Sequence, residues 1–159
     1  MSRVRRREGR KPEPSAGLID SRSDKGADTV SKDSRGYDAG KKINGRQRFI
    51  VTDILGLLLA VVVCTASIQD RDGAKPVLLD THLATPVRFV FADGAFAGRL
   101  LDRARTILAT TLHIVRKPAD QRGFAVIPRR RAWNGPSPGS PRTAVLPATT
   151  NATPPCPRP

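Results

Sequence analysis

The pattern of apolar and polar positions divides the chain into an ordered middle and two polar ends. Between residues 49 and 126, short apolar runs alternate with charged or glycine-containing segments, which is typical of an α/β domain. Residues 49–52 and 57–65 are predicted to be strands. Because only residues 53–56 connect them, the two strands should pair as an antiparallel hairpin.

Helices and strands are predicted to alternate after this hairpin. Residues 74–84 should form a helix, with Pro76 near its first turn, where proline is tolerated. Residues 87–91 form an apolar run that predicts a third strand. In residues 96–110 the apolar side chains approximate one face of a helix and the arginines the other. Residues 112–115 should form a final short strand.

The two ends lack any apolar period. Residues 1–15 are basic and contain proline, and we expect them to form a disordered arm. Residues 131–159 hold eight of the fourteen prolines and no acidic residue, so their composition also predicts disorder. The folded part is therefore expected to span residues 16–130.

One uncharged segment raises the question of a membrane. Residues 54–68 are fifteen residues without a charge, whereas a bilayer-spanning helix needs ~20 apolar residues. Adjacent valines favour a strand buried on both faces, and no membrane is expected as a partner. A small membrane-associated protein that uses this segment and its basic flanks is the less favoured alternative.

Charge then narrows the class of partner. The formal net charge is +14 and the isoelectric point about 11.3, so the chain should bind a polyanion, with nucleic acid first and an anionic membrane surface second. Two cysteines and two histidines, widely spaced, offer no zinc cluster.

Two carboxylates are placed where a metal site could form. Asp20 closes the short apolar segment Leu18-Ile19, and Asp93 closes that of residues 89–92. Carboxylates carried by neighbouring strands would provide the oxygen ligands that Mg²⁺ prefers. The alternative is that each aspartate caps a helix or starts a turn.

A basic segment is the other candidate for binding. Its cations could contact DNA phosphates; they are Lys41, Lys42, Arg46 and Arg48. The alternative is a solvated turn around Asn44-Gly45.

Several motifs in fixed order resemble one family. The stretches LIDSRSDKGADTV, RGYDAGKKINGRQRFIVTDILGLLLAVVV, ASIQDRDGAK and VFADGAFAG are similar to the DDE transposases of bacterial insertion sequences, in the large group numbered four and five. The resemblance runs from about residue 5 to residue 130. It implies an α/β fold of the RNase H-like type, here incomplete, in which a mixed sheet with three antiparallel leading strands is flanked by helices.

The resemblance also implies a chemistry. Asp20 and Asp93 match the first two catalytic aspartates, which hold Mg²⁺ or Mn²⁺ for DNA cleavage and strand transfer. The implied partner is DNA, both the ends of the element and its target, with a homo-oligomer possible on the DNA. The implied location is the bacterial cytoplasm, in association with the nucleoid.

The third carboxylate of the family is missing. Relatives carry a glutamate soon after a Pro-Arg-Arg stretch, and here Pro128-Arg129-Arg130 is present while Glu8 and Glu13 are the chain's only glutamates. Trp133 is encoded by TGG and Asn134 begins with AA, so a shifted frame reads GAA, the codon for glutamate. We therefore expect a frameshift near residues 130–132 and an out-of-frame tail at 131–159.

Only nineteen residues precede Asp20, where such transposases usually carry a DNA-binding region, so we also expect truncation at the front. The chain should then be inactive in transposition. The alternative function is a non-catalytic basic remnant that still binds DNA.

Overall fold

A computed structural model describes residues 1–27, 29 and 31–115 of the chain. The remaining residues, which include the predicted Pro-rich tail, lie outside this description. The elements in chain order are α1 (Ser2–Arg7), β1 (Ala16–Lys25), η1 (Lys32–Ser34), β2 (Gly36–Asp38), β3 (Ile43–Asp53), β4 (Leu58–Thr65), α2 (Asp70–Ala84), β5 (Phe89–Ala92), η2 (Gly94–Phe96), α3 (Arg99–Leu108) and β6 (Thr111–Ile114).

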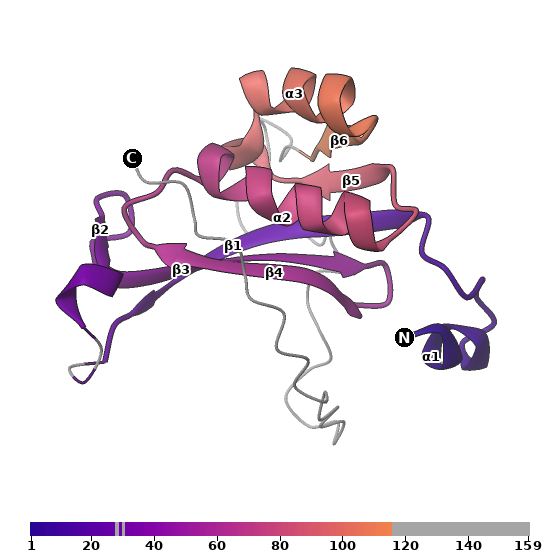
Figure 1. Cartoon of the computed structure of the whole chain (residues 1–159), viewed down its shortest axis with the longest axis horizontal. Helices are drawn as coiled ribbons and strands as arrows, with labels where there is room; N and C mark the ends of the chain where they lie inside the picture. Colours follow the sequence, from indigo (N-terminus) through magenta and orange to yellow (C-terminus); the bar gives the residue numbers. More distant parts are fainter. Residues whose placement is uncertain (28, 30, 116–159) are drawn as a thin grey trace, which may run out of the picture.

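The strands form one mixed six-stranded sheet (Figure 1). Its order is β2-β3-β1-β5-β6, and β4 also pairs with β3. The β1–β3 and β3–β4 pairs are antiparallel, whereas β1–β5 and β5–β6 are parallel. This arrangement confirms the predicted hairpin and the predicted α/β class with a mixed sheet. Its antiparallel leading strands are those of an RNase H-like fold.

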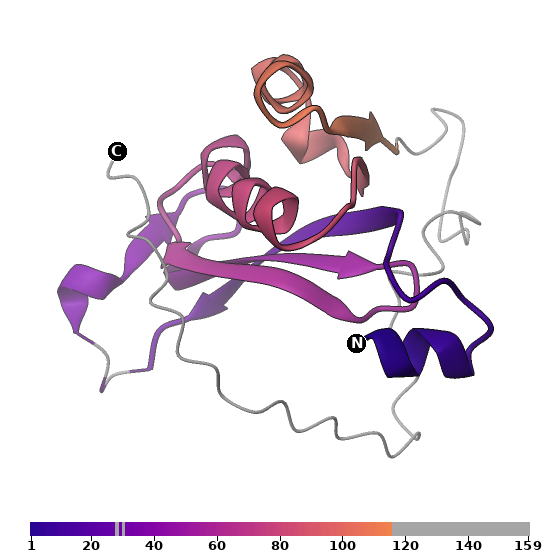
Figure 2. The same ribbon diagram turned by 45° about the vertical axis from the view of Figure 1, so that its right-hand side comes forward.

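Both long helices lie on the same side of the sheet (Figures 1 and 2). Helix α2 covers β3 and β4, and α3 lies next to α2 and β6. The contact of α2 with the sheet requires a glycine, because a Cβ on Gly73 would overlap the ring of Phe49. Phe49 is fully buried at this contact, within a core shared by the sheet and both helices. Close packing here outweighs the ~1 kcal/mol that glycine costs within a helix.

The opposite face of the β3–β4 hairpin is open to solvent. Side chains alternate along β4, so that Val62 and Cys64 are buried while Val61 and Val63 are 41% and 45% exposed. The expectation that this strand is buried on both faces is therefore wrong. An apolar run is compatible with a strand buried on one face or on both faces. Here both helices lie on one side of the sheet, so only one face of β4 is buried. In the part of the chain that the structure describes, no helix is long and apolar enough to span a membrane.

The N-terminal arm is packed rather than disordered, contrary to the sequence prediction. It forms helix α1, in which Arg5 is only 3% exposed. The Arg5 guanidinium forms an ion pair with Asp53, which is fully buried at the turn between β3 and β4, and donates a hydrogen bond to the Lys11 carbonyl at 2.9 Å. Composition could not predict this contact, since its partner lies 48 residues away.

The turn in the basic segment is not formed around Asn44-Gly45, which was the alternative considered in the sequence analysis. Asn44 and Gly45 lie inside β3, and the turn is formed earlier, where the Asp38 carboxylate accepts backbone hydrogen bonds from Gly40 and Lys41, each at 3.0 Å. Gly45 is needed for another reason, because a Cβ there would overlap the Asp24 carbonyl of the neighbouring strand. A glycine that suggests a turn in the sequence instead permits close pairing of β1 and β3.

The buried ion pair predicts a large effect on stability. Replacing Arg5 with alanine leaves the Asp53 carboxylate buried without its cation, which typically costs about 3–5 kcal/mol. Chemical denaturation should show this loss, whereas Arg6→Ala, an exposed position in the same helix, should change the free energy of unfolding by less than about 1 kcal/mol. Equal effects of the two substitutions would contradict the buried pair.

Candidate metal and DNA site

The two candidate aspartates lie on neighbouring strands. In the parallel β1–β5 pair, Leu18 stands opposite Phe91, and Asp20 and Asp93 each lie two residues further on. Asp93 directly follows its strand, as predicted. Asp20 lies in the middle of β1 rather than at its end, because residues 21–25 continue to pair with β3. The sheet therefore brings the two carboxylates to one region even though 73 positions separate them in the sequence.

Their electrostatics are those of an anionic site. Asp20 is half-buried, and this burial raises its pKa above the usual 3.8. The Asp93 carboxylate raises the pKa further, while a backbone hydrogen bond from Ser21 and the charges of Arg22 and Lys41 lower it. Burial and the Asp93 charge thus add to the cost of ionising Asp20, and a bound cation would reduce that cost.

Asp93 also fulfils the alternative role considered for it. Its carboxylate accepts a hydrogen bond from the backbone N–H of Ala95 at 2.9 Å and so caps the short helix η2. This bond fixes the direction of the side chain and leaves lone pairs on the same carboxylate for another ligand. The Asp93 carboxylate can therefore cap η2 and bind a metal at the same time.

The predicted cations divide into two groups. The first group lies on the open face of the sheet together with Asp20. In the antiparallel β1–β3 pair, Asp20 stands opposite Ile50 and Arg22 opposite Arg48, and paired residues point to the same face. Arg48 is held there by an ion pair with Asp24 at 2.7 Å. The remaining predicted cation of β3, Arg46, lies on the same face.

The other two predicted cations, Lys41 and Lys42, lie in the turn before β3, where Lys42 adopts a left-handed φ of 54°. Lys41 is close enough to Asp20 to lower its pKa. The open face and this turn thus approach the carboxylates from two directions.

Sequence reasoning missed a carboxylate next to the site. Asp70, at the start of α2, accepts a hydrogen bond from the Ser21 hydroxyl at 2.6 Å and one from the Gln47 side-chain amide at 2.5 Å. These bonds tie α2 to β1 and β3 at the residue adjacent to Asp20. A signal was present, since Gln47 is a polar residue at a position where alternation along β3 predicts burial.

A second polar network orders the turn that carries Lys41. The Ser23 hydroxyl donates to Asp38 at 2.9 Å, and the Lys41 ammonium donates to Ser23 at 3.0 Å. Desolvation opposes the ionisation of Asp38, but hydrogen bonds from the Lys41 N–H and from Ser23, together with the Lys41 charge, lower its pKa below 3.8. Asp38 is therefore a stable anion that holds Lys41 in place.

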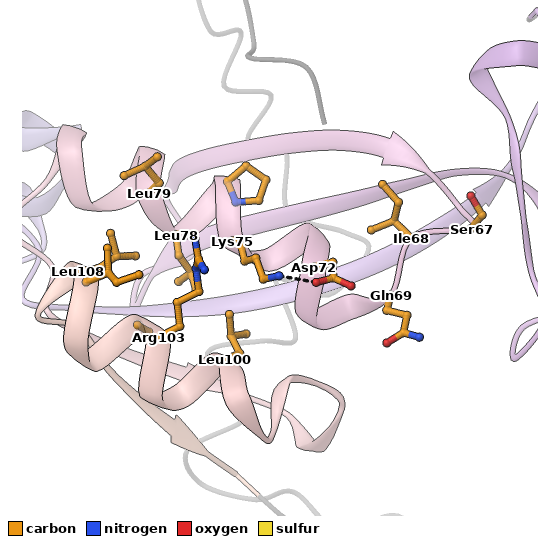
Figure 3. Close-up of a pocket in the computed structure, with 13 residues that line it drawn as sticks. Ser67, Ile68, Gln69, Asp72, Lys75, Leu78, Leu79, Leu100, Arg103 and Leu108 are labelled. Carbon is orange, nitrogen blue, oxygen red and sulfur yellow. Dashed lines mark hydrogen bonds and ion pairs between the residues drawn. The ribbon is translucent and has the colours of Figure 1, made fainter. Parts of the chain in front are cut away.

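Two hollows in the described part of the chain lie near the site, and neither of them is lined by Asp20 or Asp93. The larger, of about 720 Å³, lies between α2 and α3, and its lining includes four leucines and the Lys75–Asp72 ion pair of 2.6 Å (Figure 3). The smaller, of about 480 Å³, is lined by Lys41, Asp70 and Ala95, and so extends from the turn of β3 to the loop after Asp93.

The chemistry of the donors fits a divalent metal. Asp20 and Asp93 supply hard carboxylate oxygens, and the Asp93 charge contributes, after burial, to the raised pKa of Asp20. Among residues 1–27, 29 and 31–115, no group of three or more histidine, cysteine, aspartate or glutamate side chains could hold a metal. Any ion at this site would therefore be held by two carboxylates from the described part of the chain.

Fold and site together define a class. A mixed sheet with antiparallel leading strands and a carboxylate on each of two adjacent parallel strands is the RNase H-like arrangement. The family described as "Transposase DDE domain" matches residues 11–139, which is more than half of the chain. The protein belongs to this family, whose function lies in DNA transposition, whose partner is DNA and whose members generally use a divalent metal. Neither the curated proteins nor the solved structures gave a match.

The raised pKa of Asp20 predicts a pH-dependent stability. A carboxyl whose pKa is raised by folding stabilises the protein while it is protonated, and this contribution is lost as pH rises from about 3.8 through the folded pKa. Asp20→Asn should therefore raise the melting temperature by a few degrees at pH 7, and the gain should vanish towards pH 4.

Thermal denaturation across this pH range measures the effect, and Asp33→Asn removes an equal charge at an exposed position outside the site. Added Mg²⁺ should stabilise the unmodified chain and leave Asp20→Asn unchanged. An Asp20→Asn variant that is less stable at pH 7, or that responds equally to Mg²⁺, would contradict the assignment.

Proposed function

We propose that the chain is a bacterial insertion-sequence DDE transposase domain that binds DNA and a divalent metal but does not cut DNA. The observation that supports the metal site is the parallel β1–β5 pairing, because Asp20 lies in β1 and Asp93 directly follows β5. The contribution of the Asp93 charge to the raised pKa of Asp20 supports a shared cation. The lack of cleavage follows from the missing third carboxylate.

Asp20 and Asp93 would hold the metal. When bound, a divalent ion in such a site supplies positive charge for the oxygens of a phosphodiester and activates water for attack. The chain's own residues position these ligands. Asp93 is oriented by the Ala95 N–H, and the strand that carries Asp20 is attached to α2 through Ser21 and Asp70.

The sequence supports the loss of the third carboxylate. No glutamate or aspartate follows Asp120, although the Pro128-Arg129-Arg130 stretch that precedes the family's glutamate is retained. In the shifted frame the codon across Trp133 and Asn134 is GAA. A frameshift near residue 131 accounts for both the missing glutamate and the Pro-rich composition of the tail. Two carboxylates alone would anchor a metal less firmly and would clamp the reacting oxygens poorly.

DNA binding does not require the third carboxylate. Arg46, Arg48 and Arg22 lie on the exposed side of the sheet that also carries Asp20, and Lys41 and Lys42 lie in the adjoining turn. Contacts between such cations and phosphates release counterions and bind DNA of any sequence. The net charge of +14 acts in the same direction.

The first prediction concerns catalysis. Purified chain incubated with Mg²⁺ or Mn²⁺ and DNA bearing the element's ends should produce no cleavage or strand transfer. A chain whose reading frame is repaired after residue 130 should gain cleavage, and Asp93→Asn should abolish that gain. Cleavage by the unrepaired chain, lost in its own Asp93→Asn variant, would disprove the proposal that it is inactive.

The second prediction concerns DNA binding. Arg48→Ala should weaken binding to duplex DNA several-fold and reduce the slope of log K against log salt concentration by about 1, since one phosphate contact is lost. Titrations over a range of salt concentrations measure both quantities. Arg99→Ala, which removes an exposed cation of α3, is the matched control. An identical change in both variants would show that the open face is not the DNA-binding surface.

A further inference from the structure

The larger hollow, which we call the α2–α3 groove, is apolar from its floor to its rim. Its floor is formed by the buried side chains of Leu78 on α2 and of Leu100 and Leu108 on α3. At the rim, Leu79 of α2 is 44% exposed and Ile107 of α3 is 60% exposed. Aliphatic side chains of both helices are therefore open to a partner along this groove.

The apolar surface continues along α2 beyond the hollow. Leu83 lies one helical turn after Leu79, on the same face of α2, and is 74% exposed, although it does not line the groove. From Lys75, which lines the groove, to Leu83 the helix rises by about 12 Å. An exposed apolar row of this length offers more contact than a small molecule would use, and it matches two to three turns of another helix.

The groove also contains a cation that lacks a counter-ion. Lys75 is paired with Asp72 at 2.6 Å. Arg103, by contrast, has neither an ion pair nor a hydrogen bond with any residue that the structure describes. Figure 3 shows its side chain extending from α3 towards α2. A guanidinium beside an apolar surface favours a carboxylate from a bound partner, because the two can form charge-assisted hydrogen bonds.

The charges of the chain argue against a second copy as the occupant. Helix α3 carries three arginines and one aspartate, and the whole chain has a net charge of +14, so two copies facing each other here would repel. DNA does not fit either, because the floor of the groove is apolar and DNA presents charged phosphates to its ligands. The groove therefore suits a protein partner with acidic side chains.

We propose that the α2–α3 groove is the docking site of an acidic amphipathic helix of a partner protein. The apolar row of that helix would lie on Leu79, Leu83 and Ile107, and a carboxylate on its flank would pair with Arg103. Helices that bind in grooves use apolar anchors spaced at i, i+4 and i+7, which is the spacing that an exposed row on α2 can accommodate. Because α2 and α3 lie on one side of the sheet and Arg48 on the other, a bound partner would leave the open face accessible.

The first experiment uses a synthetic helical peptide of sixteen residues, with leucines at i, i+4 and i+7 and glutamates on both flanks. Fluorescence anisotropy of the labelled peptide should show saturable binding to the full chain. Arg103→Ala should weaken this binding about tenfold, since a charge-assisted hydrogen bond is lost. Arg105→Ala is the matched control, because it removes an exposed cation of the same helix that does not line the groove. Equal weakening by both substitutions would show that the net positive charge alone holds the peptide, and would overturn the proposal.

Two further probes separate the apolar contact from the charge. A scrambled peptide of the same composition, without an apolar face, should not bind, and Ile107→Glu should abolish binding of the original peptide. Ile107 is exposed enough for this substitution to leave the fold intact, and an unchanged melting temperature checks that it does. Binding of the scrambled peptide as tightly as the original, or full binding to Ile107→Glu, would contradict docking in the groove.

Light scattering tests the other occupant of this surface. The unmodified chain and Ile107→Glu should have the same molar mass in solution. A dimer that Ile107→Glu dissociates would show that a second copy fills the groove, and would overturn the partner proposal. The inference does not depend on the proposed DNA function, so a failure of peptide binding would leave that function standing.

Discussion

Parallel pairing of β1 with β5 is the interaction on which the candidate site depends. It sets Leu18 opposite Phe91 and thereby brings Asp20 and Asp93 onto adjacent strands. A parallel pair needs a long crossover connection, which here includes the β3–β4 hairpin and helix α2. The site therefore forms only if α2 packs on the sheet, and the absence of a side chain at Gly73 permits that contact with Phe49.

The two faces of the sheet have different roles, one in packing and the other in presenting charged side chains. The face covered by α2 and α3 holds the apolar core, so its energetic role is burial. The other face carries Asp20, two arginines of β3 and the exposed Val61 and Val63. Because alternate residues of one strand serve both faces, a substitution at one position changes either packing or the charged surface. This separation allows a basic DNA-binding face to coexist with a tightly packed interior.

Polar contacts between distant segments fix the geometry around the site. Asp70 joins α2 to β1 and β3 through Ser21 and Gln47, and the buried pair of Arg5 and Asp53 attaches the N-terminal helix at the far end of the β3–β4 hairpin. Each contact buries charge or polar groups, which is stabilising only if every partner is present. The main effect of such networks is therefore to select one arrangement of the sheet, and their net contribution to its stability is smaller.

The sequence by itself determined the local elements and the family. Two apolar runs joined by a short connection predict the hairpin of β3 and β4, and helical spacing predicts α3. The ordered motifs around Asp20 and Asp93 indicate the transposase family before any pairing is known. These signals are carried by residues close together in the chain. Tertiary structure alone decided which strands pair in parallel, which face of β4 stays open and where Arg5 finds its counter-charge. Those outcomes depend on contacts between residues tens of positions apart, about which local periodicity carries no information.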